Sequence, residues 1–158
     1  MLLRGSDMGR QKTAFTLVEV ILVVLFLGII AVIAVPRLSP SPRSKQRADS
    51  LAKKIVTDLR RTRGLAISKA AINTAGFKLV MVGSPYTSYR IVDSNSSQIV
   101  DTQTISSGVS CTGGSEFKFG PLGNLLSGSG TQLVVSASGK ICTIDITSAT
   151  GMVKCTEN

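Results

Sequence analysis

The sequence predicts an α+β protein, with a long apolar helix near the N-terminus, an amphipathic helix after it, and a β-rich domain in the rest of the chain. Three observations lead to this prediction. Residues 15–35 are almost wholly apolar, residues 43–72 repeat apolar side chains at helical spacing, and residues 73–158 contain short β-type runs separated by Gly, Ser, Asn and Pro. Helices and strands that occur in separate runs along a chain are typical of α+β proteins. We therefore expect the strands to be antiparallel and to pack on the amphipathic helix.

Residues 1–14 form a short leader that carries three basic side chains and has no long apolar stretch of its own. It is too polar to be the central region of an ordinary secretory signal. The small-residue cleavage site that usually follows such a region is also a poor match after the apolar run, where the chain reads Val35-Pro36-Arg37. We therefore expect cleavage before the run, which leaves the run in the mature protein.

The apolar run at residues 15–35 contains one charged side chain, Glu19. At about 1.5 Å rise per residue, a helix of this length can cross a hydrocarbon core of about 30 Å. A carboxylate inside such a segment is energetically costly, which makes Glu19 a functional candidate. The helix dipole favours it near the N-terminus, but in lipid it still needs a cationic partner. The alternative is a Glu side chain that reaches the membrane interface without a partner.

Residues 36–42 are expected to form a Pro-rich hinge. Pro36, Pro40 and Pro42 lack an amide hydrogen and disfavour helix at the residue before them. A second helix is expected over residues 43–72, because apolar side chains recur there every three or four positions while basic side chains mostly fill the other face. This apolar stripe predicts the surface on which the strands pack.

The positive charge is concentrated in one segment. Residues 37–69 hold ten basic and two acidic side chains, whereas residues 70–158 hold five of each. A basic segment beside a membrane favours contact with lipid headgroups or nucleic acid, and a solvated helix face explains it equally well. The positive-inside bias alone would place this segment in the cytoplasm.

The β-rich domain is expected over residues 73–158, with loops at residues 93–96 and 127–130. Its strands are recognised as short runs rich in β-branched and aromatic side chains between turn-forming residues. They are expected at residues 77–82, 86–92, 98–105, 116–119, 132–137, 140–147 and 152–155.

The composition argues against an enzyme, a metal site or a cofactor. The chain has no histidine, which removes the commonest general base and metal ligand, and it shows no paired nucleophile and base. Its three cysteines form no Cys-x-x-Cys pair.

If residues 147–151 make the last hairpin turn, Cys142 and Cys155 lie on neighbouring strands, and we expect them to form a disulfide. A bridge between Cys111 and Cys142 is the rival pairing.

The N-terminal block resembles the prepilin peptidase substrates of the type IV pilin and type II secretion pseudopilin families. A basic leader precedes Ala14-Phe15-Thr16-Leu17-Val18-Glu19, and an apolar helix follows. The resemblance implies cleavage between Ala14 and Phe15, N-methylation of the new Phe15 amine, and a role for Glu19 as the assembly carboxylate. The residue before the cut is usually Gly, and here it is Ala14.

The resemblance also bears on the helix hinge. Gly28 and Pro36 fall where pilins commonly carry a Gly and a Pro that loosen the helix. Pro40 and Pro42 are additions to the usual pattern. These four residues form the expected hinge.

The C-terminal half is similar to the GspH/FimT group of minor pseudopilins and minor pilins. The residues that carry this similarity are the helix at residues 59–66, the element Phe117-Lys118-Phe119-Gly120-Pro121-Leu122-Gly123 and the turn Gly151-Met152-Val153-Lys154. The similarity implies a pilin-like fold and a single-pass protein of the bacterial inner membrane. Its C-terminal domain would lie in the periplasm, against the positive-inside bias, and would become part of a filament after assembly.

The implied function is that of a minor pseudopilin, a non-enzymatic subunit of the type II secretion pseudopilus that contributes to filament initiation and protein secretion. Its partners would be other pilin or pseudopilin subunits, prepilin peptidase and inner-membrane lipid.

The alternative is a type IV pilus minor pilin that binds DNA during uptake, because some members of the group bind DNA through a Gly-Arg-x-Arg turn. Here Lys154 is the one cation of that turn, and backbone phosphate binding weakens with each lost cation.

Overall fold

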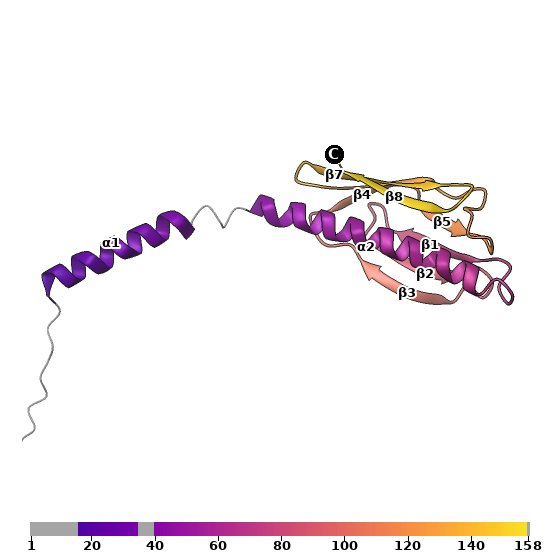
Figure 1. Ribbon diagram of the computed structural model, residues 1–158, viewed down its shortest axis with the longest axis horizontal. Helices are drawn as coiled ribbons and strands as arrows, with labels where there is room; N and C mark the ends of the chain where they lie inside the picture. Colours follow the sequence, from indigo (N-terminus) through magenta and orange to yellow (C-terminus); the bar gives the residue numbers. More distant parts are fainter. Residues whose placement is uncertain (1–15, 35–39, 158) are drawn as a thin grey trace, which may run out of the picture. The chain divides into compact units, whose positions relative to one another are not determined.

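The computed structural model describes residues 16–34 and 40–157 and divides the chain into two units, residues 1–39 and 40–158. The described part of the first unit is α1 (Leu17–Ala34), which occupies most of the predicted apolar run (Figure 1). Every side chain described in this helix is exposed. Among the described residues, no helix reaches the combined length and apolarity that crossing a membrane requires.

The second unit begins with α2 (Pro40–Ser68), whose bounds differ from those predicted at both ends. The helix starts at Pro40 rather than at residue 43, so the expectation that Pro40 and Pro42 belong to a hinge is wrong. The first amides of a helix have no partner within it, so Pro is tolerated in the first turn. The helix ends at Ser68 rather than at residue 72, and a hydrogen-bonded turn follows in which the Asn73 amide donates to the Lys69 carbonyl (2.8 Å).

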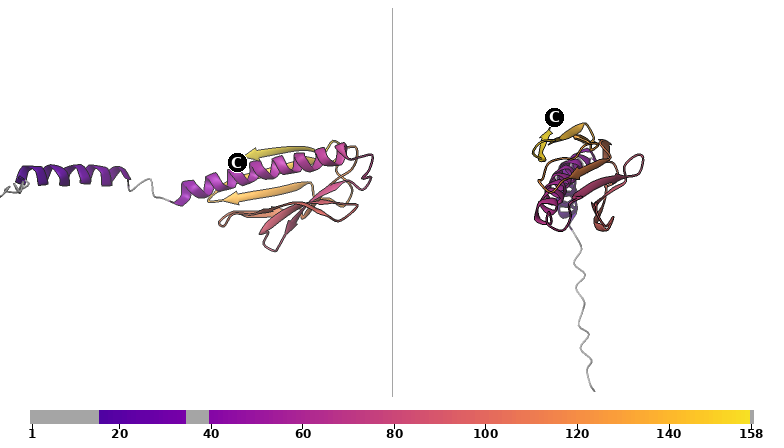
Figure 2. Two further views of the ribbon diagram at one scale, coloured as in Figure 1. Left: turned by 90° about the horizontal axis from the view of Figure 1, so that it is seen from below. Right: turned by 90° about the vertical axis from the view of Figure 1, so that its right-hand side faces the viewer.

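The strands form two antiparallel four-stranded sheets, which confirms the predicted α+β class. The first sheet has the order β3-β2-β1-β5 and comprises β1 (Phe77–Val82), β2 (Ser88–Asp93), β3 (Ile99–Thr104) and β5 (Glu116–Phe119). The second sheet has the order β4-β6-β7-β8 and comprises β4 (Ser110–Gly113), β6 (Gln132–Ala137), β7 (Lys140–Thr147) and β8 (Met152–Glu157). Figure 2 shows α2 running alongside strands of both sheets.

The predicted strands agree closely with the observed ones, with one omission. β1, β5, β6 and β7 have the predicted bounds, and β8 extends the predicted strand to Glu157. β4 was not predicted, because its sequence Ser-Cys-Thr-Gly has no alternation of apolar and polar side chains and buries only Cys111. Its pairing with β6, in which Cys111 lies opposite Val135, makes it a strand.

The core lies between α2 and the two sheets. Ile55 and Leu59 on α2 are fully buried, as the predicted apolar stripe requires. α2 contacts β1 and β5 of the first sheet and β6, β7 and β8 of the second. The sheets contribute fully buried side chains to the same cluster, among them Phe117, Leu133 and Ile144. One helix therefore supplies the packing surface for both sheets.

We expect Leu59→Ala to lower the free energy of unfolding by about 2–5 kcal/mol, because a buried side chain is lost and a cavity remains. Leu122 provides a matched control, since it is 88% exposed whereas Leu59 is 0% exposed. Leu122→Ala should change the free energy of unfolding by less than about 0.5 kcal/mol. Chemical denaturation followed by circular dichroism measures both, and equal effects of the two variants would contradict the placement of α2.

Candidate functional site

Glu19 lies in the first turn of α1, three residues after a capping residue. Its backbone amide donates to the Thr16 side-chain oxygen (3.3 Å) and to the Thr16 carbonyl oxygen (3.0 Å). A Thr followed three residues later by Glu is the spacing of a capping box, which satisfies amides at the start of a helix. Glu19 is thus held where the helix dipole favours a negative charge. Sequence reasoning missed Thr16, although the spacing from Thr16 to Glu19 could have indicated it.

The other residues predicted at the N-terminal end are described only in part. Ala14, Phe15 and Pro36 lie outside the described residues. α1 remains helical through Gly28, and the place that a Cβ would take there has no atom within 4 Å. A Gly inside a helix costs up to about 1 kcal/mol relative to Ala without ending it, so a hinge at Gly28 is not visible as a break in the described helix.

Cys142 of β7 and Cys155 of β8 form a disulfide, with their Cα atoms 6.2 Å apart. In the β7–β8 register Cys155 lies opposite Ile144, two residues along from Cys142, so the bridge is diagonal. The rival bridge from Cys142 to Cys111 is not formed. β6 separates the two strands, and two strand spacings of about 4.8 Å exceed the Cα separation of about 7 Å that a disulfide spans. Cys111 is free and buried, and burial raises the pKa of its thiol to about 11.

Three segments that are distant in sequence meet beside the C-terminal half of α2. The Arg63 Nε donates to the Gly123 carbonyl oxygen (3.0 Å). Gly151, in the β7–β8 turn, has a φ of +63°, and a Cβ added there would overlap that same carbonyl oxygen. Both the left-handed conformation and the close approach of the two backbones therefore require Gly at residue 151. Arg63 is the residue at this junction that sequence reasoning did not single out.

Lys154 lies at a groove between α2 and β8 that has a volume of about 550 Å³. Lys53 and Arg60 of α2 line the same groove. The Arg60 Nη2 donates to the Val153 carbonyl oxygen (3.2 Å), which fixes its guanidinium beside β8. Glu157, the carboxylate of the lining, pairs with Lys140 (3.1 Å). Two cations of α2 thus line the same groove as Lys154, which is far from them in the sequence.

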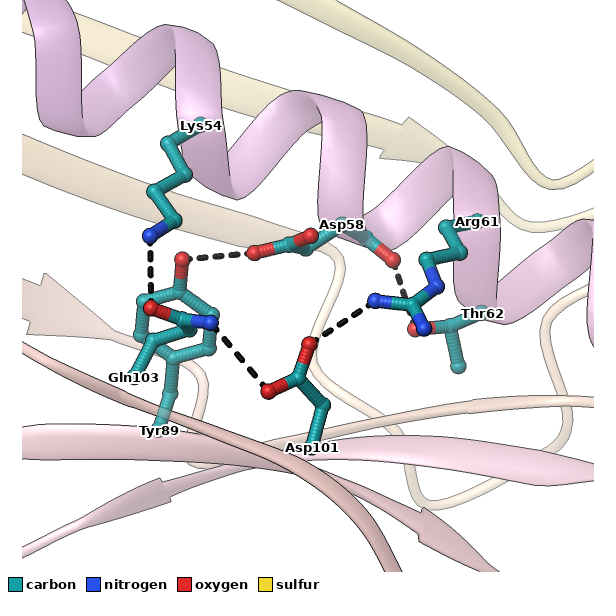
Figure 3. Close-up of polar contacts among 7 residues, drawn as sticks. All are labelled: Lys54, Asp58, Arg61, Thr62, Tyr89, Asp101 and Gln103. Atoms are coloured by element: carbon teal, nitrogen blue, oxygen red, sulfur yellow. Dashed lines mark hydrogen bonds and ion pairs between the residues drawn. The ribbon is translucent and has the colours of Figure 1, made fainter.

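A cluster of polar side chains joins α2 to β2 and β3, and Figure 3 shows its members. The buried Tyr89 hydroxyl donates to Asp58 Oδ2 (2.7 Å), and burial, together with this neighbouring carboxylate, raises the pKa of Tyr89. The Thr62 hydroxyl donates to the Asp58 carbonyl oxygen (2.6 Å). These bonds satisfy polar groups that would be costly if buried without partners.

The outer part of the same cluster is more exposed. Arg61 pairs with Asp101 (2.8 Å), and its hydrogen bond holds the pKa of that carboxyl below the usual value. A carboxyl whose pKa is lowered on folding stabilises the fold at neutral pH, and this stabilisation is lost as pH falls through the folded-state pKa. Gln103 donates to Asp101 (3.2 Å) and accepts from Lys54 (2.5 Å). The whole cluster positions α2 on the sheet.

Among the residues that the structure describes, no group of His, Cys, Asp and Glu side chains is arranged to hold a metal ion. No family model matches the chain, and no curated protein or solved structure matches it either. A functional proposal therefore rests on the motifs of this chain and on the geometry described above.

The cysteine arrangement predicts a specific alkylation pattern. Non-reduced native protein should react little with iodoacetamide, because the disulfide removes two thiols and burial keeps Cys111 protonated. Unfolding without reductant should expose one reactive thiol, and unfolding with reductant should expose three. Intact-mass spectrometry counts the adducts, and three adducts without reductant would contradict the disulfide.

Proposed function

We propose that the chain is a minor pseudopilin, a non-enzymatic structural subunit of the type II secretion pseudopilus that contributes to filament initiation and to protein secretion. The observation that carries the proposal is the block from Ala14 to Glu19 followed by α1, whose first turn bears the one carboxylate of the apolar run. A basic leader, a small residue and Phe-Thr-Leu-Val-Glu form a combination that resembles prepilin peptidase substrates.

In this proposal prepilin peptidase cleaves after Ala14, and the new Phe15 amine is methylated. Residues 15–35 hold the subunit in the bacterial inner membrane before assembly, with residues 40–158 in the periplasm. The described side chains of α1 are exposed on all sides, and an all-apolar helix surface needs lipid or neighbouring subunits to cover it. Transfer of such a helix from lipid into a filament replaces one apolar surrounding by another. Glu19 would then pair with the Phe15 amine of a neighbouring subunit.

The second unit supports the proposal in a different way. The three stretches that carry the resemblance to the GspH/FimT group meet in space, because Arg63 of α2 binds Gly123 and both lie against Gly151. If the three stretches resembled the group only by chance, there would be no reason for them to be in contact in the folded unit. We therefore propose that residues 40–158 adopt a pilin-like fold and face the other minor subunits.

We expect Glu19→Gln to leave the protein in the membrane fraction and to exclude it from filaments. The variant keeps the size of the side chain and removes its charge, so a desolvated amine of the neighbouring subunit would lose its partner. Recovery in sheared filaments should fall by at least about ten-fold, since an unpaired buried charge costs several kcal/mol. The matched control is Val20→Ala, which changes the next residue without removing a charge. Normal incorporation of Glu19→Gln would refute the role given to Glu19.

The alternative function is that of a type IV pilus minor pilin that binds DNA during uptake. The observation that favours it is the groove at β8, where Lys53, Arg60 and Lys154 lie together. Three cations in one groove can neutralise more phosphates than Lys154 alone.

The DNA-binding alternative predicts salt-sensitive retardation of duplex DNA by the full chain in detergent, whereas a purely structural subunit predicts none. Lys154→Ala should weaken the retardation if the groove binds DNA, because one of its three cations is lost. Lys118→Ala removes the same charge from β5 and serves as the control. Equal retardation by both variants would remove the groove from consideration.

A further inference from the structure

The basic side chains of α2 fall into two groups along the helix. Toward the C-terminal end, most of them are held by partners within the unit: Lys53 by Asp49, Lys54 by Gln103, Arg60 by the Val153 carbonyl, Arg61 by Asp101 and Arg63 by the Gly123 carbonyl. Toward the N-terminal end, Arg43, Lys45 and Arg47 are exposed, and no described residue forms a hydrogen bond or ion pair with them. The cations of α2 that have no partner among the described residues are therefore concentrated at its N-terminal end.

Two of these unpaired cations line a groove. Arg43 and Arg47 are four residues apart, which places them one above the other on the same face of the helix. Together with Lys54 they form one wall of a groove of about 430 Å³, and Thr104 and Ser106 belong to the other side. Lys54 is held at the groove by its hydrogen bond to Gln103. The volume lies within the range of sites that bind small molecules or headgroups, about 300–1,000 Å³.

The lining of this groove suits a phosphate group. Arg guanidinium groups bind phosphate oxygens with two parallel hydrogen bonds, and Lys adds a point charge. The remaining polar side chains of the lining, Gln46, Ser50, Thr104 and Ser106, are neutral and can donate hydrogen bonds. No carboxylate belongs to the described lining, so a bound anion would meet no like charge there.

The position of the groove in the chain identifies the source of the phosphate. α2 begins at Pro40 and α1 ends at Ala34, and the connection between them can extend over no more than about 20 Å. If residues 15–35 lie in a membrane, the start of α2 must remain near the headgroups. Basic side chains near an anionic leaflet are each favoured, and the attraction falls off within a Debye length of about 8 Å.

We propose that the groove formed by Arg43, Arg47 and Lys54 binds the phosphate of anionic phospholipid headgroups while the subunit is in the membrane. This inference rests on the membrane anchor of the proposed function. The positive-inside bias alone would not place the basic end of α2 on the periplasmic side. Binding to lipid phosphate would give these cations a partner there. The groove has no aromatic side chain in its lining on which a base could stack, so a nucleic acid is less well matched.

The test uses the full chain in nanodiscs of phosphatidylcholine with a minor share of phosphatidylglycerol, and native mass spectrometry of the lipids that the protein retains. The retained phosphatidylglycerol should be enriched about five-fold for each cation that contributes. R43E/R47E should return the retained lipids to the bulk ratio. R90E/K118E is the matched control, since it changes the net charge equally at residues of β2 and β5 that do not line the groove, so it should keep the enrichment. Circular dichroism should show the same unfolding transition for both variants.

Several outcomes would overturn the proposal. Enrichment that persists in R43E/R47E, or that disappears equally in R90E/K118E, would show that the groove does not select the lipid. Loss of enrichment on adding inorganic phosphate at constant ionic strength would assign the groove to a free anion, and displacement by duplex DNA would assign it to nucleic acid. A chain that does not remain in these nanodiscs would overturn the membrane anchor itself, and this result is read from protein recovery rather than from the lipid ratio.

Discussion

The burial of one apolar face of α2 against two sheets is the interaction on which the rest of the second unit depends. Each four-stranded sheet has an apolar face, and the two faces contribute to one cluster that also contains Ile55 and Leu59. A sheet left without a packing surface would expose its apolar side chains to water. The Asp58–Tyr89 hydrogen bond lies within this buried surface and restricts how the helix can rotate on the first sheet.

The same burial determines where the positive charge lies. With one face of α2 committed to the core, its basic side chains must emerge on the remaining faces. Arg60 and Arg61 reach a carbonyl and a carboxylate partner on β8 and β3, and Arg63 reaches the Gly123 carbonyl in the turn after β5. Arg43 and Arg47 have no such partner among the described residues. A single packing arrangement thus gives the cations in the C-terminal half of the helix partners within the fold and leaves those at its N-terminal end without a described partner.

In the proposed role as a filament subunit, the two units have different tasks. α1 presents an apolar surface with one carboxylate held in its first turn by the Thr16 cap. The core cluster described for the second unit is built from residues of that unit alone, independently of α1. A subunit that passes from membrane to filament needs this independence, because the surroundings of its apolar helix change while its domain stays folded.

The sequence by itself determined the α+β class, the apolar stripe of α2, the bounds of β1, β5, β6 and β7, and the nearness of Cys142 and Cys155, because each follows from local periodicity and turn chemistry. Tertiary structure alone decided that β4 is a strand, that α2 begins at Pro40, and that Arg63, Gly123 and Gly151 meet. Local patterns encode which side of an element is apolar. They do not encode which distant backbone supplies a hydrogen-bond partner, and that depends on how the elements pack.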